Sequence, residues 1–244
     1  MKNEVVERCD SALHLGHKLH TTNTHDVLMN HAIEKLNNSF HGFMSRFRSC
    51  NVTSKNKLFH QYCSSMYGSQ LWQMSNAQRI YSKWRKYHRI VLEVGNKTHC
   101  DLLPLIAENM PLECILDLKY LSFYKSIISS ENSIVKYTAQ SMSHSHTSML
   151  CKNLLHLTYK YKLSMEDIMT YSKSKLKMHC YGNWLERIEN AYPIHASVIR
   201  ELIAMKEGRG TRIFSNEECN YIINFLCTLQ NEEDENYFPL HLID

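Results

Sequence analysis

Nine lysine and arginine side chains between residues 46 and 89 suggest a surface that binds anions, because they are cationic and closely grouped. Residues 41–100 contain ten Lys and Arg against a single Glu, a net charge of +9. Cationic side chains in loose spacing bind phosphate oxygens without a sequence code, so the stretch predicts contact with an RNA or DNA backbone. The alternative is a solvated helix surface, which most charge runs are. The candidate backbone-binding residues are Arg46, Arg48, Lys55, Lys57, Arg79, Lys83, Arg85, Lys86 and Arg89.

The carboxylates point away from nucleotidyl transfer. That reaction needs metal-bound carboxylates that clamp the attacking and leaving oxygens. The seven aspartates stand at 10, 26, 101, 117, 167, 234 and 244, and none neighbours another. We therefore predict no catalytic residue in this chain and no polymerase activity for it in isolation.

Histidine and cysteine are abundant, but their spacing is irregular. Zinc sites need four converging ligands, usually from close pairs, and the nine cysteines form no C-x-x-C pair. We predict no metal site and no cofactor, and we expect reduced, mostly buried thiols. The motifs G-x-S-x-G, H-E-x-x-H, the P-loop and G-x-G-x-x-G do not occur, so no small-molecule substrate is evident.

Five aromatic side chains could stack on bases. At helical spacing beside other apolar residues, such side chains more often belong to a core, and we favour that interpretation. They are Trp72, Trp84, Trp184, Tyr62 and Tyr67.

The elements that must position these residues are predicted to be mainly helical. Only 7 Gly and 4 Pro occur in 244 residues, too few turn signals for an all-β fold. Leucines at alternate positions around Gly16 predict a short N-terminal β-hairpin. From Thr24 the apolar spacing changes to three or four, which predicts an amphipathic helix. Further helices are predicted from an N-cap at Thr53 or Ser54, and over 75–91, 112–128, 133–141, 147–161, 164–172, 182–190, 194–206 and 215–229.

Several sequence segments, taken in order, resemble one protein family. Leu13-His-Leu-Gly-His17 is similar to a hairpin segment at the end of the palm in LINE-type (non-LTR, jockey-like) retrotransposon reverse transcriptases. The segment 58–72, with Tyr-Gly-x-x-x-Trp after a Cys, resembles the thumb of that family. Two later segments, 84–106 and 123–135, continue the resemblance, which covers roughly residues 12–140.

The resemblance implies a fragment of an RNA-directed DNA polymerase, with a thumb-like helical bundle and a C-terminal helical extension. Residues 1–23 would be the remnant of the palm's last hairpin, with Leu15, Gly16 and His17 in the position that grips the primer. Residues 24–140 would be the basic thumb, and 141–244 a helical region with an acidic tail. The catalytic Asp pair and its Mg²⁺ would belong to a palm domain outside this chain, which would be a partner.

A second class of function stays open: a non-enzymatic helical module that binds another protein through its apolar faces. The first thirty residues contain no secretory segment, and no apolar run is long enough to span a bilayer. These features predict an intracellular protein, cytoplasmic or nuclear, with no membrane partner.

Overall fold

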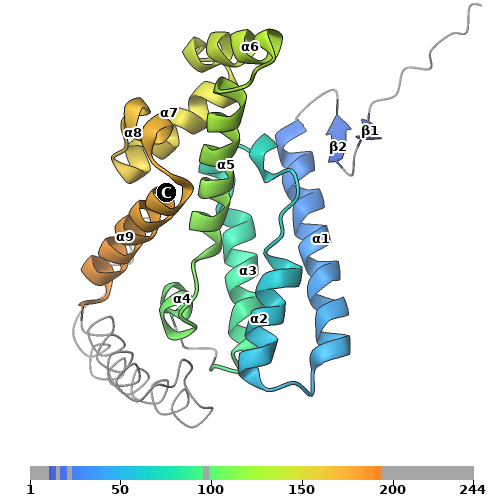
Figure 1. Ribbon diagram of the computed structural model, residues 1–244. Coiled ribbons are helices and arrows are strands. Elements are labelled where there is room, and N and C mark those ends of the chain that lie inside the picture. Colours follow the sequence, from blue (N-terminus) through green and yellow to red (C-terminus); the bar gives the residue numbers. More distant parts are fainter. Residues whose placement is uncertain (1–10, 15–16, 21–23, 96–98, 194–244) are drawn as a thin grey trace, which may run out of the picture.

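The computed structural model describes residues 11–14, 17–20, 24–95 and 99–193, and this part of the chain is mainly helical, as the sequence predicts (Figure 1). The helices in chain order are α1 Thr24–Phe47, α2 Val52–Cys63, α3 Gln78–Val91, α4 Leu103–Ile106, α5 Leu112–Ile128, α6 Ser133–His144, α7 Met149–Tyr161, α8 Met165–Thr170 and α9 Lys173–Ala191. Three short 3₁₀ turns, η1 Ser69–Leu71, η2 Met74–Asn76 and η3 Cys100–Leu102, connect them.

Two short strands precede α1. Strand β1, Ser11–His14, pairs antiparallel with β2, His17–His20, and β2 lies beside the start of α1 (Figure 1). The predicted hairpin turn, Leu15-Gly16, lies outside the described residues.

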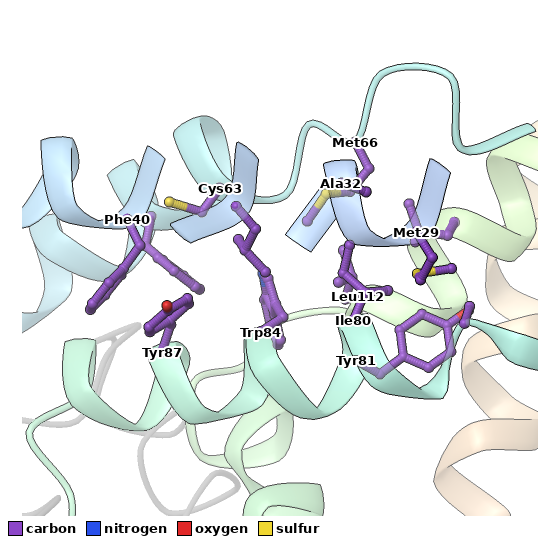
Figure 2. Close-up of a cluster of buried hydrophobic side chains, with 14 of the residues drawn as sticks. Met29, Ala32, Phe40, Cys63, Met66, Ile80, Tyr81, Trp84, Tyr87 and Leu112 are labelled. Carbon is purple, nitrogen blue, oxygen red and sulfur yellow. The ribbon is translucent and has the colours of Figure 1, made fainter. Parts of the chain in front are cut away.

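Helices α1, α2 and α3 pack around the first of two large cores. Their apolar residues recur every three or four positions, so each helix has one face to bury. Figure 2 shows side chains from all three helices meeting along one seam. The Phe40 ring stacks on Tyr87 with centroids 3.9 Å apart, and Phe59 lies 5.4 Å from Trp84. The indole nitrogen of Trp84 donates to Ser64 Oγ at 3.1 Å, so this buried polar group is satisfied.

Helix α5 joins this core to the second one. Leu112 and Leu116 in its first half pack with α1–α3, whereas Leu121 and Tyr124 pack with α7, α8 and α9. A helix that is apolar on most of its circumference is buried on several sides, and α5 lies centrally among the other helices in Figure 1.

The predicted boundary between residues 140 and 141 falls within α6, four residues before its end at His144. Ala139 on α6 and Leu150 on α7 belong to the same hydrophobic cluster. Residues on both sides of that boundary therefore pack together.

Helix boundaries follow local capping signals. Helix α8 begins with a capping box, in which Ser164 Oγ accepts from the backbone N–H of Asp167 at 3.0 Å. The prediction for α2 was wrong, because Asn51 and not Thr53 or Ser54 is its N-cap. Helix α9 begins at Lys173, nine residues before the predicted start, because Ser172 caps it. The helices predicted at 194–206 and 215–229 lie outside the described residues.

Candidate nucleic-acid interface

Helix α3 presents one cationic face. Its core residues, such as Ile80 and Trp84, point inward, whereas Arg79, Lys83 and Lys86 follow one another at helical spacing along one side of that buried face. The helix contains no acidic residue. Arg79 and Lys86 are exposed and Lys83 is partly exposed, and none of the three forms an ion pair with an acid of the described part. We call these three residues the α3 stripe.

Polar residues of α1 flank the α3 stripe. Arg79 donates to Asn30 Oδ1 at 3.1 Å, and the Tyr87 hydroxyl donates to Asn37 Oδ1 at 2.6 Å. The Lys83 ammonium lies 5.4 Å from the centroid of the Tyr87 ring, an attractive cation–π geometry. These contacts place α1 and α3 side by side and hold the Arg79 guanidinium and the Lys83 ammonium in place.

Two other cations of α3 are engaged within the protein. Arg85 forms an ion pair with Asp101 of η3, and Arg89 donates to the thiol of Cys100. Both partners belong to the segment that leads into α4. The structure therefore separates Arg85 and Arg89 from the α3 stripe and uses them to hold η3 against α3.

Lys55 is the least available of the nine candidates. Lys55 is only 4% exposed, and its ammonium pairs with Glu93 just beyond the end of α3. A buried, paired ammonium cannot contact a phosphate unless the ion pair first opens. The burial of Lys55 therefore argues against direct contact with a ligand.

The remaining three candidates lie elsewhere on the surface. Arg46 in the last turn of α1, Arg48 in the following turn and Lys57 on α2 are exposed. Arg46 follows Asn30 by sixteen residues, a rotation of about 160° around the helix. It therefore does not continue the α3 stripe.

The predicted primer-grip residues are only partly described. Leu15 and Gly16 lie outside the described residues, and His17 is the first residue of β2. Their role stays a prediction.

The aromatic candidates divide into two groups. Trp72, Trp84 and Trp184 are between 1% and 3% exposed, so the core interpretation is confirmed for the tryptophans. It is wrong for Tyr62 and Tyr67, which are 51% and 69% exposed.

A buried polar network on α5 was not anticipated. Asp117, 1% exposed, accepts hydrogen bonds on Oδ2 from Lys160 Nζ at 2.6 Å and from the Tyr161 hydroxyl at 2.7 Å. Glu113, one turn earlier, accepts from Arg187 at 3.1 Å. Burial lowers the pKa of Lys160, but the two carboxylates outweigh it, and the pKa is raised overall. The feature of the sequence that indicates this network is an aspartate between two leucines, Leu116-Asp117-Leu118.

A cleft of about 1100 Å³ opens beside this network, between α3, α5, α7 and α9. Glu113, Lys160 and Arg187 line it, and they already bind one another. The arrangement joins three helices electrostatically. The cations of Lys160 and Arg187 pair with the Glu113 carboxylate, and such pairing is more typical of contacts that stabilise a fold than of a catalytic site.

Other kinds of site find no support in the described part of the chain. No three or more His, Cys, Asp or Glu side chains converge there as a metal would need. None of its helices is both long enough and apolar enough to cross a bilayer. The six described cysteines, at 50, 63, 100, 114, 151 and 180, are all free.

Searches of protein-family models, of curated proteins and of solved structures found no match to this chain.

Proposed function

We propose that the protein binds RNA or DNA backbones through the α3 stripe. This is the role that the sequence resemblance to the thumb region of LINE-type reverse transcriptases implies. The observation that carries the proposal is the stripe itself: Arg79, Lys83 and Lys86 on an acid-free helix, without an acidic partner among the described residues. Cations without an acidic partner release counterions from a polyanion when they bind it.

The length of the stripe suits a nucleic-acid strand. Seven residues of α-helix separate Arg79 from Lys86, a rise of about 10 Å. A strand that rises about 3.4 Å per nucleotide presents roughly three phosphates over that length. Asn30 and Asn37, beside the stripe, add neutral hydrogen-bonding groups. Beyond its first turn, α1 contains a single carboxylate, that of Glu34, which lies between Asn30 and Asn37 in the sequence.

The proposal limits the activity to binding. The catalytic Asp pair and its Mg²⁺ would belong to a palm domain outside this chain. Primer extension by the purified protein should therefore yield no template-dependent product, and a product that depends on the template would contradict this part of the proposal.

Binding is tested by fluorescence anisotropy of a labelled oligonucleotide over a salt titration. The triple variant Arg79→Gln/Lys83→Gln/Lys86→Gln should reduce the slope of log K against log salt by about 2 to 3, at roughly 0.9 per lost phosphate contact. A matched control, Lys136→Gln/Lys152→Gln/Lys162→Asn, removes three exposed lysines of α6, α7 and the α7 C-cap. Equal losses in both variants, or no binding at low salt, would overturn the proposal.

One observation favours the alternative, a protein-interaction module. Helix α6 is exposed over nearly all of its surface, and its Ile134 and Tyr137 are 76% and 74% exposed. Exposed apolar patches often mark contact surfaces. The variant Ile134→Ser/Tyr137→Ser should abolish partner binding under the alternative and leave oligonucleotide affinity unchanged under the main proposal.

A further inference from the structure

A second cleft, of about 820 Å³, lies between α5, the start of α9 and the end of α2. It is distinct from the α3 stripe and from the cleft beside Asp117. Three lysines line it, Lys119 on α5 and Lys173 and Lys177 on the first turns of α9. We call it the lysine cleft.

The charges of the lysine cleft are unbalanced, unlike those beside Asp117. Three ammonium groups face one lining carboxylate, that of Glu108. No side-chain hydrogen bond or ion pair joins Lys119, Lys173 or Lys177 to any other residue of the described part of the chain. Burial lowers the pKa of Lys119, which shows that its ammonium is partly desolvated. An anion would offset this desolvation.

Two neutral polar groups of residues that line the cleft have no hydrogen-bond partner among the described residues either. The side-chain amide nitrogen of Asn109 and Nε2 of His60 are buried and have no partner in the described structure. An amide nitrogen is a donor, and an imidazole nitrogen can be one. Helix α9 also begins at this cleft with Lys173, so the positive end of its dipole adds to the lysine charges.

The wall of the cleft is apolar. Met110, Ile115 and Phe123 are partly exposed and line it together with the nearly buried Leu118. A simple inorganic anion would leave this wall uncovered, and a fatty acid would bring only one charge to three lysines. A phosphorylated molecule with an aromatic body matches both parts, because Phe123 offers a ring for stacking.

We infer that the lysine cleft binds a phosphorylated small molecule of the nucleotide type, with its phosphates on Lys119, Lys173 and Lys177 and its base against Phe123 and Ile115. The inference does not depend on the α3 stripe. The two sites are formed by different helices and are lost through different substitutions.

The test is isothermal titration calorimetry of the full chain with ATP, tripolyphosphate and adenosine. ATP should bind more tightly than tripolyphosphate, and adenosine should not bind. Lys119→Gln/Lys177→Gln should weaken ATP binding by at least about tenfold, because the variant removes two charge-assisted hydrogen bonds to the phosphates. Phe123→Ala should reduce the advantage of ATP over tripolyphosphate.

Two controls separate this site from others. Lys136→Gln/Lys152→Gln removes the same number of exposed lysines, and the triple variant of the α3 stripe removes the proposed nucleic-acid surface. Both should keep ATP affinity within about twofold. Equal weakening in the control and cleft variants, or tripolyphosphate binding as tightly as ATP, would overturn the inference, as would an absence of ATP binding in the unmodified protein.

Discussion

Asp117 of α5 and Lys160 of α7 form a buried ion pair, with Nζ 2.6 Å from Oδ2. The lysine side chain is 14% exposed and the aspartate side chain 1%. The pair connects the central helix to the C-terminal half of the described structure. Tyr161 donates to the same carboxylate oxygen at 2.7 Å, so the pair belongs to a network that holds α5 and α7 in one register.

Removing one partner of this pair should be costly. Lys160→Met leaves the Asp117 carboxylate buried without its cation, and we expect a loss of about 3–5 kcal/mol in the free energy of unfolding by urea. The double variant Lys160→Met/Asp117→Leu should recover most of that loss. Arg187→Gln, which breaks a half-exposed pair with Glu113, serves as the control and should cost less than about 1 kcal/mol. Similar losses for Lys160→Met and Arg187→Gln would contradict the role of burial.

Acidification should destabilise the protein through His60. Burial lowers the pKa of His60 from 6.5 to about 4. The unfolded chain therefore binds the proton at higher pH than the folded chain. The resulting stability is fully present above pH 6.5 and is lost as the pH falls toward 4. Between pH 7.5 and 5 the free energy of unfolding should fall by about 2 kcal/mol from this residue alone.

Urea unfolding at several pH values measures this effect, and its readout is the slope against pH. Burial also lowers the pKa of His88, whose ring lies 5.2 Å from that of His60, so it adds in the same direction. His60→Gln should flatten the slope, whereas His144→Gln, at an exposed position on α6, should leave it unchanged. A slope unaffected by His60→Gln would show that other groups cause the acid sensitivity.

Asn153 should be a sensitive position on α7. Its buried amide donates to the carbonyl oxygen of Trp72 at 2.7 Å and accepts from the backbone nitrogen of Met74 at 2.9 Å. Asn153→Leu would leave both backbone groups buried without a partner, at a cost of about 2–5 kcal/mol in thermal or urea unfolding. Asn38→Leu, at an exposed position on α1, should change stability by less than about 0.5 kcal/mol. Comparable effects at the two positions would rule out the bridging role.

Lys55 and Lys83 should behave differently although the sequence groups them together. Lys83→Met removes a member of the α3 stripe and should weaken oligonucleotide binding on the order of fivefold at low salt. Lys55→Met replaces a buried cation whose partner, Glu93, is half exposed and can be hydrated, so affinity should stay within about twofold. Anisotropy titrations at one salt concentration compare the two directly. A loss for Lys55→Met equal to that for Lys83→Met would mean that Lys55 reaches the ligand.

The sequence by itself determined the helical character and most helix positions. The spacing of apolar residues from Leu28 to Phe47 matches α1, and the limits predicted for α5 match the structure. The helix predicted over 164–172 contains α8, Met165–Thr170. These features are local, because a helix and its cap depend on residues within four positions of one another. The start of α9 was missed although Ser172 caps it and Leu176 and Cys180 continue the apolar stripe of the helix toward its N-terminus.

Only the tertiary structure decided which charges are free. Lys55 meets Glu93 across 38 residues of sequence, Arg85 meets Asp101 across 16 and Lys160 meets Asp117 across 43. The sequence counted Lys55, Arg85 and Lys83 alike, and packing left only Lys83 without a carboxylate. It also brought Lys119 together with α9 to form the lysine cleft. The physical reason is that pairing and burial depend on which helix faces meet, and no local spacing encodes that.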